Sequence, residues 1–232
     1  GEARRAAVSD GGPATGPRMV AEWEPAHGAL VRWPLGIPLD LAVELARDDT
    51  LYTLVETSGA EQQARATFAG AGIDLGMVRF VRGDLWSMWT RDWGPQAVFD
   101  AQGVMAYADP WFDGYPWVPG CDLAPPAAPR APAASARTGR GYDEDDALPA
   151  VVAAALGVPL APLPAYLTGG NVMTDGLGIA WSTRQMLDEN APYISENVFR
   201  SRVAQVMGVD DYRFIIEPEV HGIQHIDCYA KL

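Results

Sequence analysis

Polar and aromatic residues that could bind a cation gather in one tryptophan-rich stretch of the chain. The motif WTRDWGP spans residues 89–95, and five of the eight tryptophans fall between positions 86 and 117. Indole faces attract cations such as guanidinium, and a nearby carboxylate can form paired hydrogen bonds with a planar guanidinium group. The motif therefore predicts either a cation site or an aromatic core that carries an Arg91–Asp92 surface pair.

A second candidate lies near the C-terminal end, in the segment HGIQHIDCY. If residues 225–229 form a strand, alternate side chains share a face, so His225 and Asp227 lie together. An imidazole beside a carboxylate is suited to general acid–base chemistry. The same alternation turns Cys228 to the opposite face, where we expect a buried structural cysteine rather than a nucleophile.

Other interpretations have less support from the residues. His221, His225 and Asp227 could bind a metal ion, but no further His or Cys ligand is nearby. The paired glycines of TGGN, residues 168–171, would bring the backbone close to a ligand, although a plain turn between strands is the better explanation of this motif taken alone. Neither a P-loop nor a G-x-G-x-x-G motif follows any predicted strand, which argues against a nucleotide site.

The composition excludes several classes of protein. The 232 residues are 48% hydrophobic and 20% charged, which is typical of a globular chain. A net charge of −13 argues against nucleic acid as a partner. Only two cysteines are present, which excludes a disulfide scaffold and a four-thiolate zinc site. The uncharged run 148–167 has the length of a membrane span, but four prolines and a glycine interrupt it.

The elements that must position these motifs follow from hydrophobic periodicity and turn residues. Strands are predicted at 51–57, 77–81, 96–99, 104–108, 172–174, 179–183, 213–219 and 225–232. Helices are predicted at 61–69, 145–156 and 195–207, the last capped by Ser195 and ended by Gly208. The hairpin turns around Gly103 and Gly178 are 75 residues apart. This spacing indicates an α/β fold with repeated ββαβ units.

The chain is expected to form one domain with two loosely packed segments. Residues 1–18 are polar and glycine-rich and predict a flexible tail before a domain at 19–232. Residues 119–146 are rich in Pro, Ala and Gly and predict a surface insertion.

Taken together, the motifs resemble those of the bacterial peptidylarginine deiminase and agmatine deiminase family, within the guanidino-modifying pentein superfamily. Four segments carry the resemblance in family order: AEWEPAHGALVRWP (21–34), WTRDWGP (89–95), TGGNVMTDGLG (168–178) and HIDCYAKL (225–232). The resemblance implies an α/β propeller of five ββαβ-type units around a central site. The chain is expected to contain about three of the five units, so the propeller would be incomplete.

The resemblance also implies roles for individual residues. Asp92 and Asp227 would bind the guanidinium nitrogens, and His225 would act as the general acid and base. Trp89, Gly170 and Asn171 would line the substrate site. No cofactor is implied.

The nucleophile of the family is a cysteine that follows the HID motif. Neither Cys121 nor Cys228 matches it, so we expect the thiol on a C-terminal segment or a second chain. On this expectation the chain alone is inactive.

The resemblance implies conversion of an arginine or peptidyl-arginine guanidinium into a citrulline-type ureido group and ammonia. Thr168, where agmatine-specific members tend to have Glu, favours the peptidylarginine branch. The stretch 108–117 lacks the arginines with which secreted members bind a substrate carboxylate. Conversion of agmatine to N-carbamoylputrescine and a non-catalytic guanidine-binding module therefore remain alternatives. An extracellular or periplasmic location is expected, with a cytoplasmic one as the alternative, and no membrane or nucleic-acid partner.

Overall fold

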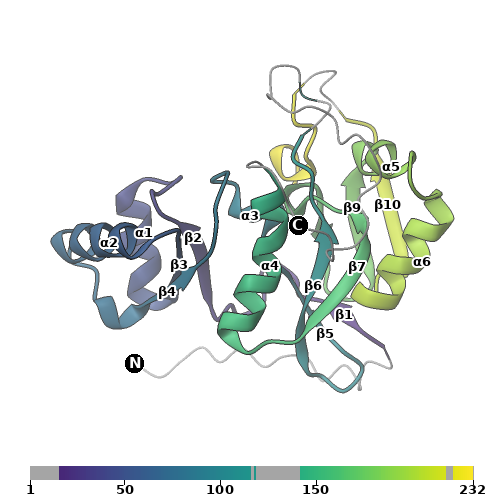
Figure 1. Ribbon diagram of the computed structural model, residues 1–232. Coiled ribbons are helices and arrows are strands. Elements are labelled where there is room, and N and C mark those ends of the chain that lie inside the picture. The colour runs from purple at the N-terminus through teal and green to yellow at the C-terminus, as the bar shows by residue number, and fades with distance from the viewer. Residues whose placement is uncertain (1–15, 116–117, 119–141, 218–221, 232) are drawn as a thin grey trace.

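Three small β-sheets lie side by side in chain order (Figure 1). The computed structural model describes residues 16–115, 118, 142–217 and 222–231. The predicted tail therefore lies almost wholly outside the described residues, as do positions 119–141 of the predicted insertion. Residues 142–146, assigned to that insertion, instead begin a helix, so the insertion was predicted too long.

The first sheet is parallel throughout. It has the order β2 (Gly28–Arg32), β3 (Thr50–Val55), β4 (Val78–Arg82), connected by α1 (Leu39–Asp48) and α2 (Ser58–Gly70), and the turn η1 (Leu75–Met77) precedes β4. Strand β3 is central, and Leu51, Leu54 and Val55 are fully buried. Parallel strands covered by helices bury consecutive residues, which explains why β3 does not follow the alternation predicted for 51–57.

The second and third sheets share one connection pattern. The second has the order β1 (Arg18–Met19), β5 (Gln96–Phe99), β6 (Met105–Trp111), β7 (Leu160–Tyr166), and α4 (Tyr142–Leu156) precedes β7. The third contains β8 (Met173–Thr174), β9 (Ile179–Thr183) and β10 (Asp211–Ile215), with α5 (Gln185–Asn190) and α6 (Glu196–Met207) before β10. In both sheets an antiparallel hairpin is followed by helix and a parallel strand. These are ββαβ units, as the repeat predicts.

The two hairpin turns use the same chemistry 75 residues apart. Asp100 Oδ1 accepts hydrogen bonds from the backbone N–H groups of residues 102 and 104, each at 2.8 Å. Asp175 Oδ1 accepts from residues 177 and 179, at 2.8 and 3.0 Å. Gly103 and Gly178 both have positive φ, which favours glycine. The internal repeat is thus reproduced at the level of single hydrogen bonds.

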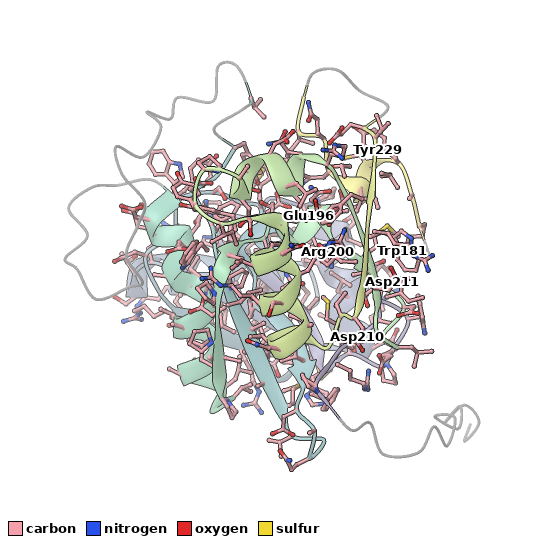
Figure 2. All side chains as sticks on the ribbon, turned by 90° about the vertical axis from the view of Figure 1, so that its right-hand side faces the viewer. Trp181, Glu196, Arg200, Asp210, Asp211 and Tyr229 are labelled. Carbon is pink, nitrogen blue, oxygen red and sulfur yellow. The ribbon has the colours of Figure 1, made fainter. Side chains whose placement is uncertain are left out.

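Helix α6 agrees with its predicted ends. Ser195 Oγ accepts from the N–H of residue 198 at 3.4 Å, and Gly208 ends the helix in the left-handed conformation with φ 65°. Its inner face buries Phe199, Val203 and Met207 completely. Glu196 and Arg200 lie on its outer face and form an ion pair of 2.7 Å (Figure 2). Among the described residues no helix is long and apolar enough to cross a membrane.

Candidate active site

Three short helical turns bring the candidate residues together. They are α3 (Thr90–Trp93), η2 (Gly169–Asn171) and η3 (Ile226–Cys228). Gly169 allows η2 to touch α3, because a Cβ atom at this position would lie only 2.0 Å from the carbonyl oxygen of Arg91. Gly169 is therefore required for the close approach of two backbone segments.

Asp92, on α3, is a buried carboxylate held by two donors. Its Oδ1 accepts a hydrogen bond of 3.0 Å from the N–H of Gly170, and its Oδ2 accepts one from the hydroxyl of Tyr115. Burial raises the pKa of Asp92, and the two hydrogen bonds oppose this by favouring the ionised form. Asp92 is thus buried rather than part of a surface pair with Arg91.

His225 is buried beside Asp92. Its Nδ1 lies 3.5 Å from Asp92 Oδ1, and its Nε2 is buried with no hydrogen-bond partner among the described residues. Burial lowers the pKa of His225 to about 4, although the nearby charge of Asp227 opposes the shift. The pKa of Asp227 is raised, mainly by burial, despite the attraction of His225. At neutral pH the imidazole is therefore uncharged.

Gly170 is the point at which these groups converge. A Cβ atom on Gly170 would lie 2.5 Å from Asp92 Oδ1, 2.7 Å from His225 Nδ1 and 3.0 Å from Asp227 Oδ2. Only a hydrogen atom fits there. The arrangement brings two carboxylates and an imidazole together against Gly170, and a group of neighbouring acceptors of this kind suits a planar cation with several N–H donors.

Asn171 supports the site from behind. Its Oδ1 accepts hydrogen bonds from Thr183 N, Thr183 Oγ1 and Ile226 N at 3.0, 3.1 and 3.2 Å. The buried amide thus joins η2 to η3, and the single hydroxyl hydrogen of Thr183 is shared between Asn171 Oδ1 and the carbonyl oxygen of Gln224, which lies at 2.6 Å. Asn171 positions His225 through the backbone.

Trp89 stands at the start of α3, and its side chain is 47% exposed. The loop before α3 is fixed by helix α4, because Asp145 Oδ1 accepts from the N–H groups of Trp86 and Ser87 at 3.0 and 3.1 Å. The structure therefore brings Asp92, Gly170, His225 and Asp227 into one cluster, and Trp89 directly precedes the helix that carries Asp92.

The prediction of a strand at 225–232 is wrong. Residues 226–228 form the turn η3, because the N–H of Ile226 bonds to Asn171 Oδ1 rather than to a neighbouring strand. Cys228, expected to be buried, is exposed, and its Sγ lies 3.7 Å from Asp227 Oδ1. The strand predicted at 213–219 ends at Ile215. His225 and Asp227 are close together for a different reason from the predicted strand alternation.

Sequence reasoning missed two residues that hold the site together. One is Tyr115, for which the sequence pattern contains no signal. The other is Glu22, which bridges Arg91 on α3 and Lys231 after η3, at 2.7 and 2.6 Å. Both cations lower the pKa of Glu22, the hydrogen bond from Lys231 contributing most.

Replacing Glu22 with glutamine is expected to loosen this bridge. The free energy of unfolding should fall by less than about 1 kcal/mol, since the pairs are partly exposed. Affinity for a guanidinium ligand should fall severalfold at low salt, and the difference from wild type should shrink near 1 M NaCl. Thermal melts and calorimetric titrations measure both effects. Glu44→Gln, which breaks an exposed pair with Arg47, is the control, and an equal loss of affinity in it would contradict the prediction.

The buried neutral His225 predicts a pH dependence of stability. Its folded pKa of about 4 lies below the ordinary value of 6.5, so the unfolded chain binds the proton more tightly. The contribution is fully present above pH 6.5 and is lost as the pH falls toward 4, by about 3 kcal/mol. Urea unfolding from pH 7 to 4 should show a smaller loss for His225→Asn than for wild type. Identical losses, or an imidazole NMR titration midpoint near 6.5, would contradict it.

The arrangement of the described residues adds no support for a metal site. No group of three or more His, Cys, Asp or Glu side chains among the described residues could hold a metal ion, and His221 lies outside them.

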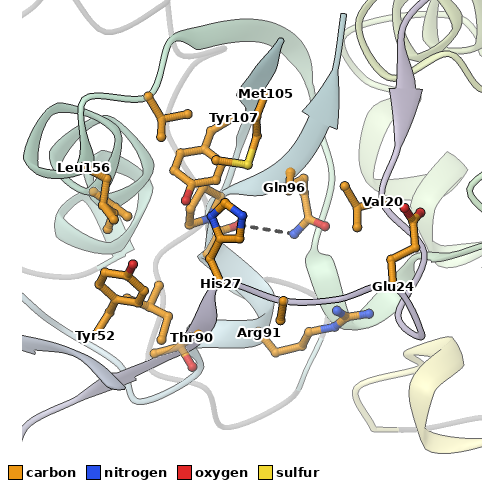
Figure 3. Close-up of a pocket in the computed structure, with 18 of the residues that line it drawn as sticks. Val20, Glu24, His27, Tyr52, Thr90, Arg91, Gln96, Met105, Tyr107 and Leu156 are labelled. Carbon is orange, nitrogen blue, oxygen red and sulfur yellow. Dashed lines mark hydrogen bonds between the residues drawn. The ribbon is translucent and has the colours of Figure 1, made fainter. Parts of the chain in front are cut away.

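A separate hollow of about 1150 Å³ lies beside α3 (Figure 3). Its lining includes His27, Arg91 and Tyr107, but none of the four clustered residues. The candidate active site is therefore distinct from this hollow.

Several solved structures that share this fold are assigned as peptidyl-arginine or agmatine deiminases. The chain is 19% identical to a protein assigned as a peptidyl-arginine deiminase, with a TM-score of 0.67, covering 90% of this chain and 60% of that one. For the agmatine deiminase of Enterococcus faecalis the values are 20%, 0.67, 91% and 57%. For the C. jejuni agmatine deiminase they are 13%, 0.66, 91% and 60%. The chain therefore spans about 60% of the length of these proteins.

These likenesses define the class: a mixed α/β fold with several sheets, shared with guanidino-group deiminases. The model of the Porphyromonas-type peptidyl-arginine deiminase family matches residues 18–232, and the chain belongs to this family.

Proposed function

We propose that this chain forms the guanidinium-binding part of a guanidine-deiminating hydrolase of the peptidyl-arginine deiminase type. One observation carries the proposal: Asp92, Asp227 and His225 all lie against Gly170 and so form one group of side chains. Two neighbouring carboxylates complement a guanidinium group, which offers N–H donors along its edges and carries one positive charge. Trp89, which is exposed at the start of α3, would cover one face of the bound cation.

The proposed reaction exchanges one guanidinium nitrogen for oxygen. A cysteine thiolate adds to the guanidinium carbon, the C–N bond breaks, and the nitrogen leaves as ammonia with a proton from His225. Water then adds to the thiouronium carbon, His225 takes its proton, and the C–S bond breaks to release the ureido product. Because His225 is neutral at pH 7, it can first accept the thiol proton that it later gives to ammonia.

We propose that the thiol belongs to a C-terminal segment of a longer protein or to a second chain. Thiolates are stabilised by cationic surroundings, whereas the Sγ of Cys228 faces a carboxylate oxygen of Asp227. Cys121 lies outside the described residues. We also infer that the two ββαβ units belong to a ring of five such units. The 75-residue repeat supports this inference.

The substrate is proposed to be an arginine side chain within a peptide. Thr168 is buried before the paired glycines, and its Oγ1 has no hydrogen-bond partner among the described residues. No arginine follows the WTRD motif between positions 92 and 117 to bind a substrate α-carboxylate. This absence equally suits agmatine, which has no carboxylate and is the second candidate substrate.

Calorimetric titration of the chain tests the binding function. Nα-benzoyl-L-argininamide should bind, whereas the uncharged Nα-benzoyl-L-citrullinamide should not. Asp92→Asn should lower the affinity at least about 30-fold, because it removes a buried charge partner. Asp100→Asn, in a hairpin turn, is the matched control. Equal binding of the two ligands would overturn the proposal.

Turnover separates the catalytic assignments. Ureido product from the isolated chain would contradict the external thiol. Guanidinium binding without turnover by the full-length gene product would favour a non-catalytic module.

A further inference from the structure

Tyr115 is placed to control the Asp92 carboxylate. Its ring is 3% exposed, contacts Phe112 and Tyr142 edge-on with centroids 5.9 and 5.7 Å away, and lies 5.7 Å from the ring of His225. Its hydroxyl donates to Asp92 Oδ2. Because the ring is confined by this aromatic cluster, the hydroxyl has a fixed position relative to α3.

We propose that Tyr115 is a positioning residue of the guanidinium site: its hydroxyl holds Asp92 in one rotamer, with Oδ1 turned toward Gly170, His225 and Asp227. This inference rests on the proposed function, in which Asp92 binds the guanidinium group. The geometry does not depend on that function, since Tyr115 and the N–H of Gly170 donate to different oxygens of Asp92. A carboxylate held at both oxygens cannot rotate without losing one of two buried hydrogen bonds.

The hydroxyl also affects the charge of Asp92. The groups that act on this carboxylate are Tyr115, the N–H of Gly170, Arg91, His225 and Asp227. Burial raises the pKa of Asp92, and the hydrogen bond from Tyr115 is the main effect that opposes it. Without the hydroxyl the burial remains, so a larger fraction of Asp92 would be protonated and unable to bind a cation.

Tyr115 itself remains a donor at all relevant pH values. Burial is the main cause of its strongly raised pKa, and the negative charge of Asp92 adds to it. Tyr142 and Asp145 shift it in the same direction. The phenol is therefore a fixed hydrogen-bond donor rather than a titrating group in this site.

Tyr115→Phe tests the proposal, because it removes only the hydroxyl and keeps the ring in the cluster. The first readout needs no ligand: an NMR titration of the Asp92 carboxyl carbon in the whole 232-residue chain. Its midpoint should move upward by about one pH unit, since a hydrogen bond to a charged group is lost. Tyr107→Phe removes a half-buried hydroxyl from β6 and should leave the Asp92 midpoint unchanged. An unchanged or lowered midpoint in Tyr115→Phe would overturn the proposal.

The second readout is the affinity for Nα-benzoyl-L-argininamide from pH 4 to 8. In Tyr115→Phe, the pH below which affinity is lost should rise together with the Asp92 midpoint. In an Asp92→Asn background the same change should leave the pH dependence of affinity unaltered, because the two residues act as one unit. A pH dependence that still shifts in that background would contradict the proposal. If wild type binds no ligand at any pH, the proposed function fails, and the carboxyl titration still decides the role of Tyr115.

Discussion

Replacing Gly170 with alanine should abolish guanidinium binding while the chain stays folded. The added methyl group would lie 2.5 Å from Asp92 Oδ1, 2.7 Å from His225 Nδ1 and 3.0 Å from Asp227 Oδ2. Contacts this short force apart all three of the groups that we propose bind the ligand. We expect the affinity for Nα-benzoyl-L-argininamide to fall at least about 100-fold, measured by calorimetry. The free energy of unfolding should fall by about 1 to 3 kcal/mol, which is typical of an overpacked site.

A matched glycine separates crowding from loss of backbone freedom. Gly70 ends α2, and a Cβ atom there meets nothing within 4 Å. Neither Gly170 nor Gly70 has a positive φ, so alanine is compatible with both backbones. Gly70→Ala should therefore keep the affinity of wild type and gain up to about 1 kcal/mol of stability. Wild-type affinity in Gly170→Ala would show that the ligand binds elsewhere.

The parts of the fold that are set by local interactions could be predicted from the sequence. The two hairpins follow from an aspartate that bonds its own turn and a glycine that permits positive φ, and both were placed correctly. Both ends of helix α6 could be predicted because the residues that cap it, Ser195 and Gly208, directly flank the helix in the sequence. Helix α3 has only four residues, too few to show a helical period.

The segment after residue 224 could not be predicted in the same way. Ile226 and Cys228 alternate with polar residues as in a strand, yet the N–H of Ile226 bonds to an amide 55 positions earlier in the chain. The hydrogen bond from Tyr115 to Asp92 is likewise a tertiary contact, across 23 positions. The motifs contain the residues of the candidate site, whereas the groups that hold them in place depend on contacts between distant segments.

Asn171→Ala should therefore disconnect η3 from its support. The substitution removes the oxygen that accepts from Thr183 N, Thr183 Oγ1 and Ile226 N, and leaves two buried backbone N–H groups without an acceptor. Each orphaned donor costs about 1 to 3 kcal/mol, so the free energy of unfolding should fall by about 3 to 5 kcal/mol. Urea unfolding measures this loss. Hydrogen exchange at Ile226 should also become faster than the exchange of amides in β9, because η3 is released locally.

The control is another buried asparagine with three hydrogen bonds. Asn190 exchanges two bonds with the backbone of Tyr166 and donates a third to the carbonyl of Met186, and none of these bonds involves η3. Asn190→Ala should lose a similar amount of stability but keep its guanidinium affinity at temperatures where the chain is folded. Asn171→Ala should lose at least about tenfold in affinity under the same conditions, since His225 and Asp227 are no longer held above Gly170. Equal affinities in the two variants would mean that η3 keeps its position without the amide, and that Asn171 contributes to the fold alone.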